Sequence, residues 1–115
     1  MKRIEYTEIT KGKLKDLKEK LTAEYGEDVA KKAIKEILEK AKLLSHFEEM
    51  GVSLTNLYGV KTDYRYLYLR PNYLFYRIEE ERIIIMNIYH EKEDFMRTLF
   101  PESSILQEEQ FHYQP

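Results

Sequence analysis

Residues 64–100 read YRYLYLRPNYLFYRIEEERIIIMNIYHEKEDFMRTLF and contain three short runs with the character of β-strands. The runs cover residues 64–69, 73–78 and 82–90. Pro71 and Asn72 predict a turn after the first run, and residues 79–81 predict a second turn. Residues 83–86 are apolar on both faces, which is typical of a central, covered strand. We therefore expect a three-stranded antiparallel meander.

The segment before the meander begins with a strand and a helix. Residues 2–8 alternate in character, with Ile4 and Tyr6 on one side, so we expect a first strand that joins an edge of the meander. Residues 13–25 then carry apolar side chains at helical spacing, and Thr10 is a candidate N-terminal cap for this helix.

A second helix should follow directly. Gly26 breaks the helical pattern, as a C-terminal glycine does, and acidic residues open the next periodic segment. One face of this second helix is apolar, and it carries Val29, Ala30, Ala33, Ile34, Ile37, Leu38, Ala41 and Leu44. Both helices are one-sided, so we expect a helical hairpin that lays its apolar stripe on the sheet.

These elements predict an α+β fold in which a twisted antiparallel sheet of about four strands packs on the hairpin. Residues 45–63 form a long connection that is apolar in part. Residues 92–100 predict a short closing helix, because Pro101 follows it. We expect one domain over residues 1–100, followed by a polar tail at residues 101–115.

The composition narrows the class of protein. The 19 basic and 21 acidic residues give a net charge of −2, whereas proteins that depend on many phosphate contacts usually carry a basic total. The chain has no cysteine, and its three histidines are far apart, so we expect no disulfide, no metal and no cofactor. No segment approaches the roughly 20 apolar residues that span a bilayer, and we expect a cytoplasmic protein without a membrane partner.

The end of the last strand offers candidate acid–base groups. His90 titrates near neutral pH when unperturbed, and Tyr89 can stack on a nucleobase or assist proton transfer. In a regular strand, however, these neighbouring side chains point to opposite faces. The alternative is that His90 lies in a solvated rim of the sheet.

Two arginines on the meander are candidate phosphate ligands. Arg65 and Arg77 can each bind a phosphate through two hydrogen bonds. They can equally pair with Asp63 or with the acidic residues 79–81 at the sheet surface, where ion pairs contribute little. The tyrosines of the meander allow base stacking, a half-buried sheet face or a partner-binding surface, and we favour the partner surface. This stripe consists of Tyr64, Tyr66 and Tyr68, with Tyr73 and Tyr76 opposite.

The order of elements, together with the runs Tyr64-Arg65, 73–78 (YLFYRI) and 88–90 (IYH), resembles the RelE/ParE superfamily of bacterial toxins over roughly residues 1–100. The resemblance implies the toxin half of a type II toxin–antitoxin module, associated with growth inhibition and plasmid stabilisation. It implies a cognate antitoxin as partner. The target would be DNA gyrase or, for the nuclease members, mRNA in the ribosome.

Within this superfamily the sequence favours the ParE-like branch. The ribosome-dependent nucleases are usually basic and carry an arginine on the third strand, where this chain has Tyr73 and a negative total charge. Two alternatives remain open. One is a RelE-like mRNA endoribonuclease that uses Arg65, Arg77, Tyr89 and His90. The other is a non-toxic interaction domain with the same fold.

Overall fold

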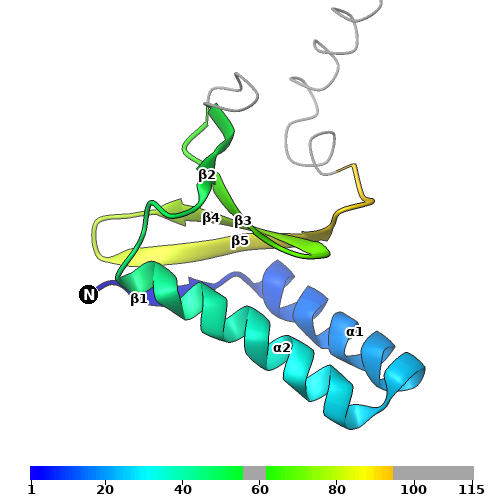
Figure 1. The fold of residues 1–115 in the computed structure, drawn as a ribbon. Coiled ribbons are helices and arrows are strands. Elements are labelled where there is room, and N and C mark those ends of the chain that lie inside the picture. The colour runs from blue at the N-terminus through cyan, green and yellow to red at the C-terminus, as the bar shows by residue number, and fades with distance from the viewer. Residues whose placement is uncertain (56–61, 95–115) are drawn as a thin grey trace, which may run out of the picture.

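The computed structural model describes residues 1–55 and 62–94, which form a layer of helices beneath one face of a twisted sheet (Figure 1). The elements follow in the order β1 (Arg3–Tyr6), α1 (Glu8–Tyr25), α2 (Glu27–Lys42), the 3₁₀ helix η1 (Leu43–Ser45), β2 (Val52–Ser53), β3 (Arg65–Leu69), β4 (Asn72–Ile78) and β5 (Arg82–His90). The predicted α+β class, the helical hairpin and the meander are confirmed.

The sheet has the strand order β1-β5-β4-β3-β2. Strands β3, β4 and β5 form the expected antiparallel meander, and β1 joins its edge by pairing parallel to β5. The sheet therefore has five strands instead of about four, and it is mixed instead of antiparallel throughout, because β1 runs parallel to β5. The additional strand, β2, lies within the predicted connection and pairs only Val52 with Tyr66 and Ser53 with Arg65. Two residues are too few for an alternation that sequence reading can detect.

The first helix begins earlier than its apolar spacing predicts. Thr7, not Thr10, is the N-cap, because the Thr7 side chain accepts a hydrogen bond from the Thr10 backbone N–H at 3.2 Å. Thr10 is fully buried and donates its hydroxyl to the Ile85 carbonyl oxygen at 3.1 Å. This threonine therefore ties α1 to β5. At the other end, Gly26 has φ +97° and separates the two helices.

The main core lies between the hairpin and the sheet. The helices and η1 contribute Leu14, Ile37, Ala41 and Leu44, and the sheet contributes Leu74, Tyr76, Ile83, Ile85 and Ile88. The prediction that Val29 and Leu38 belong to the buried face of α2 was wrong, since they are 49% and 40% exposed. The stripe that contacts the sheet is narrower than the apolar face of the helix.

The opposite face of the sheet carries a second cluster of Leu54, Phe75 and Tyr89, against which Tyr64, Tyr66 and Tyr73 pack. Residues 91–93 continue from β5 as a turn and bend, in which the Glu93 N–H donates to the His90 carbonyl. The predicted closing helix is therefore not present at residues 92–94. Its remainder at residues 95–100 and the predicted tail at residues 101–115 lie outside the described residues. Within the described part of the chain, neither helix is long and apolar enough to cross a bilayer.

Candidate functional site

Arg65 serves as a tether on the helix side of the sheet. It stands opposite Tyr76 in the register of β3 and β4, and Tyr76 belongs to the core beneath the sheet. Its Nη1 donates to the carbonyl oxygens of Gly51 at 3.0 Å and Glu49 at 3.5 Å. The guanidinium therefore holds the backbone that leads into β2. Whether it can also contact a phosphate stays a prediction.

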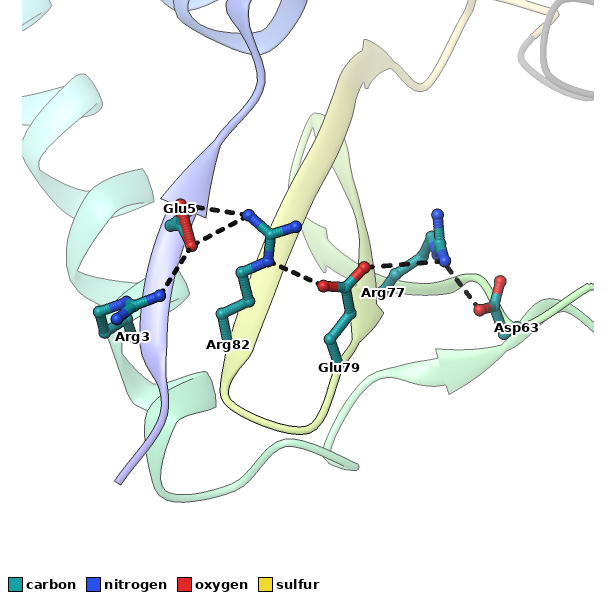
Figure 2. A network of polar contacts seen from close by, with 6 residues as sticks. All are labelled: Arg3, Glu5, Asp63, Arg77, Glu79 and Arg82. Carbon is teal, nitrogen blue, oxygen red and sulfur yellow. Dashed lines mark hydrogen bonds and ion pairs between the residues drawn. The ribbon is translucent and has the colours of Figure 1, made fainter.

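Arg77 follows Tyr76 and therefore points to the other face of the sheet. There it takes part in a chain of alternating charges that crosses three strands (Figure 2). The chain consists of Arg3, Glu5, Arg82, Glu79, Arg77 and Asp63. Its shortest contact joins Arg82 Nε to Glu79 Oε1 at 2.8 Å, and this hydrogen bond is the main cause that raises the pKa of Arg82. Arg77 is paired with Asp63 Oδ2 at 3.2 Å, as one of the two sequence-based interpretations expected.

Tyr89 is only 3% exposed and belongs to the aromatic cluster on the outer face. Its hydroxyl accepts a hydrogen bond from Asn87 Nδ2 at 3.0 Å, and Lys13 Nζ lies 3.8 Å from the ring centroid. Burial raises the pKa of the Tyr89 phenol. Burial also lowers the pKa of the Lys13 ammonium, and the negative charge of Glu93 partly offsets this lowering. The ring is thus a packed and partnered group.

His90 occupies the helix side of the sheet, where it stands directly opposite Asn72 on β4. Its Nδ1 accepts the Lys92 N–H at 3.1 Å, and its own backbone N–H donates to Glu93 Oε1 at 3.0 Å. Because Nδ1 is an acceptor, the proton of the neutral ring lies on Nε2. His90 and Tyr89 therefore point to opposite faces, as the alternation of a strand requires.

The structure does not bring the four candidate residues together. Arg65 and His90 share the helix side, but the register separates them by the four residues from Tyr76 to Asn72, which is about 13 Å along β4. Arg77 and Tyr89 share the outer face and are separated by a similar distance, since their register partners on the neighbouring strands are four or five residues apart. The two residues of each pair are therefore too far apart to contact the same small ligand. In residues 1–55 and 62–94 no cluster of three acidic or histidine side chains is suitable for holding a metal.

The tyrosine stripe is divided between the two faces. Tyr73 contacts Tyr66 and Tyr68 on the outer face, with ring centroids 5.2 and 4.9 Å apart. Tyr76, which the sequence suggested as part of the same stripe, lies fully buried in the main core. The Tyr68 hydroxyl donates to Glu91 Oε2 at 2.7 Å, and this bond is the first cause that raises its pKa. Five tyrosines have raised pKa values: Tyr6, Tyr66, Tyr68, Tyr76 and Tyr89.

Sequence reasoning missed a cleft between the hairpin and the ends of β4 and β5. It consists of two neighbouring cavities of about 590 and 280 Å³. The cavities have four lining residues in common: Leu17, Lys20, Asn72 and His90. The sequence assigned Asn72 to a turn, whereas it is the first residue of β4 and 9% exposed. Asparagine is common in turns, so nothing in the sequence indicated that this one is buried.

The sequence matches a known protein family over most of its length. The family model described as the ParE toxin of the type II toxin–antitoxin system parDE matches residues 4–95. The chain belongs to the ParE toxin family. A solved structure described as the chromosomal ParDE toxin–antitoxin system from P. aeruginosa is similar to this ParE-family chain, with a TM-score of 0.66 and 22% identity. The match covers 78% of this chain and 96% of the other, and at this identity it supports the fold.

No curated protein matches the chain. The family membership confirms the predicted ParE-like toxin of a type II module, and it does not favour the nuclease or the non-toxic domain. It also supports a cognate antitoxin as partner of this ParE-family toxin.

Proposed function

We propose that this ParE-family toxin arrests bacterial growth in the cytoplasm by binding DNA gyrase, and that its antitoxin prevents this by binding the toxin. The observation that carries the choice of mechanism is the separation of the four candidate residues over two faces of the sheet. A toxin that acts by binding requires a surface, and it does not require converging acid, base and cation. The net charge of −2 likewise favours a protein target over an RNA substrate.

The chemistry of RNA cleavage supports the same choice. Attack by a 2′-hydroxyl needs a base, an acid for the leaving oxygen and a cation near the phosphate, all within hydrogen-bond reach of one phosphodiester. Here Arg65 binds backbone carbonyls and Arg77 binds Asp63, and about 13 Å lies between Arg65 and His90. Each arginine therefore already uses part of its guanidinium to hold a protein group.

The test begins with induced expression in bacteria, with DNA damage and translation scored separately. We expect growth arrest with a DNA-damage response while labelled amino acids are still incorporated, and rescue when the antitoxin is co-expressed. With purified components, the toxin should inhibit supercoiling by gyrase. Loss of translation before any DNA damage, with gyrase unaffected at equimolar toxin, would overturn the proposal.

Two substitutions test the nuclease alternative. If the toxin cleaved mRNA with these residues, His90→Gln and Arg77→Ala would each abolish codon-linked cleavage in a folded protein. Under the proposed mechanism, wild-type toxin produces no such cleavage. The comparison is read from primer extension on mRNA recovered from ribosomes.

A further inference from the structure

A depression between the two helices, which we call the lysine depression, carries a concentrated positive charge. It has a volume of about 310 Å³, and the described residues that line it come from α1 and α2 alone. Glu39 is the one acidic residue among them, against the four lysines Lys18, Lys31, Lys35 and Lys42. This local excess contrasts with the net charge of −2 of the whole chain, so a ligand of the depression should be negatively charged.

The lysines are only partly neutralised by neighbouring carboxylates. Lys31 and Lys35 each approach a glutamate of α2, with Nζ–Oε1 distances of 2.9 and 3.9 Å. Lys18 and Lys42 form no ion pair with any group in residues 1–55 and 62–94. Their ammonium groups can therefore pair with carboxylates of another segment.

The lysine depression also has an apolar surface. Leu38 is 40% exposed, and Ile34 is partly buried at the border of the main core. Residues four apart are neighbours on one side of a helix, so these two side chains form one continuous patch between the lysines. The depression therefore suits a segment that combines carboxylates with apolar side chains.

The C-terminal segment of this chain has that composition. Residues 98–115 contain no lysine or arginine and three glutamates, Glu102, Glu108 and Glu109. The same residues include four apolar or aromatic side chains, Ile105, Leu106, Phe111 and Tyr113. We propose that residues 102–113 cover the lysine depression of their own hairpin, with the glutamates beside the lysines and an apolar side chain on Leu38. This intramolecular contact goes beyond the proposed function and does not depend on which target the toxin binds.

The length of the segment allows this placement. Near the last described residues, Glu93 lines a cavity together with Lys20 of α1. Lys18 lies about 200° around the helix from Lys20, so the segment must pass to the other flank of α1. Half the circumference of a helix about 10–12 Å in diameter is about 16–19 Å. The chain from Asp94 to Glu102 extends up to about 27 Å, which is enough for this passage.

Covalent connection favours this segment over a separate acidic protein. Ion pairs of exposed lysines are individually weak, and they weaken further when salt screens the charges. A short linker, however, gives the attached segment an effective concentration in the millimolar range. A contact that would be too weak between separate molecules is therefore populated within one chain.

The absence of cysteine makes the full-length protein suitable for a spin-label experiment. Gln114→Cys introduces a single thiol, to which a nitroxide is attached. The nitroxide broadens the NMR signals of groups close to it. We expect the backbone amide signals of Ile34 and Leu38 to lose at least half of their intensity. The signal of Val52, which stands opposite Tyr66 on the outer face of the sheet, should keep its intensity.

Charge variants of the labelled protein test the cause of the contact. Lys35→Glu combined with Lys42→Glu should reduce the broadening at Leu38 at least twofold, and so should salt at about 1 M. Lys32→Glu is the matched control, because Lys32 is exposed on α2 and does not line the depression. It should leave the broadening unchanged. Changing all three glutamates of the segment to glutamine should act like the double lysine variant and leaves both helices unaltered.

Mixed samples show whose segment is bound. When spin-labelled ¹⁴N protein is mixed with unlabelled ¹⁵N protein, the signals of Ile34 and Leu38 should stay sharp. Broadening in this mixture would assign the contact to a second copy and overturn the proposal. Sharp signals at both residues in the labelled ¹⁵N protein, or broadening at Leu69 and Asn72 of the cleft in their place, would also overturn it. Broadening that survives both the lysine and the glutamate variants would refute the role of charge on which the proposal rests.

Discussion

The hydroxyl of Tyr76 is the most informative single group to remove from this fold. Tyr76 is fully buried, and its hydroxyl accepts the Gly51 N–H at 2.9 Å and donates to the Glu48 carbonyl oxygen at 2.8 Å. It thereby fixes the segment before β2 on β4, more than twenty residues away in the sequence. Tyr76→Phe keeps the ring and removes only these two bonds.

The expected cost follows from the two hydrogen bonds. Each neutral bond contributes about 1 kcal/mol, and the buried Gly51 N–H that remains would lack a partner, which adds a further penalty. We expect Tyr76→Phe to lower the free energy of unfolding by about 2–3 kcal/mol. For a urea m-value of about 1.5 kcal/mol/M, the unfolding midpoint should fall by about 1.3–2 M.

The assay is urea unfolding followed by circular dichroism, with Tyr25→Phe as the control. Tyr25 is 64% exposed, so the loss of its hydroxyl should leave the midpoint almost unchanged. Equal midpoints for Tyr76→Phe and Tyr25→Phe would show that the tether contributes nothing, and the account of how β2 is held would be refuted.

Four further results are expected. Gly51→Ala should cost about 1–3 kcal/mol in urea unfolding, because a Cβ there would lie 2.5 Å from the Tyr76 hydroxyl oxygen; wild-type stability would contradict this. Asn87→Ala should cost about 1–2 kcal/mol by thermal unfolding, since it removes the buried hydrogen bond that Asn87 Nδ2 donates to the Tyr89 hydroxyl. The five tyrosines with raised pKa values bind protons more tightly in the folded state than in the unfolded state. Stability should therefore be maintained below about pH 10 and fall above it, although the lowered pKa of Lys13 acts in the opposite direction. Urea midpoints measured across that range check the sign. Arg82→Gln should cause only a small loss that disappears at high salt, as expected of exposed ion pairs.

The elements that sequence reading identified are those with a strong repeating pattern. The meander and the hairpin each have several periods of alternation or helical spacing, so tertiary packing confirms a preference that is already local. The cap of α1 was misplaced because Thr7 and Thr10 have the same capping chemistry, three residues apart. Only the sheet distinguishes them, since it buries Thr10 against the Ile85 carbonyl.

The candidate site was less predictable because it depends on faces and partners. Sequence reading identified Arg77 and its two interpretations, a phosphate ligand or a partner in a surface ion pair. Only the fold shows that Asp63 lies beside it. Asn72 follows a proline and has the composition of a turn, whereas its burial depends on a helical hairpin more than thirty residues earlier. Properties of this kind arise from long-range contacts and have no local signal.

An irregularity in β5 connects the fold to the cleft. The register of β4 and β5 advances from Phe75–Asn87 to Tyr76–Ile85, so β5 has one extra residue at this point. In a regular strand that starts with Ile83 facing the helices, Tyr89 would also face the helices and His90 would face away. The bulge reverses this phase, since one inserted residue re-aims every side chain beyond it. It therefore sends Tyr89 into the outer aromatic cluster and sets His90 beside Asn72. Tyr89 and His90 would point to opposite faces with or without the bulge, so the extra residue decides only which face each side chain takes, and it thereby places His90 in the cleft with Asn72.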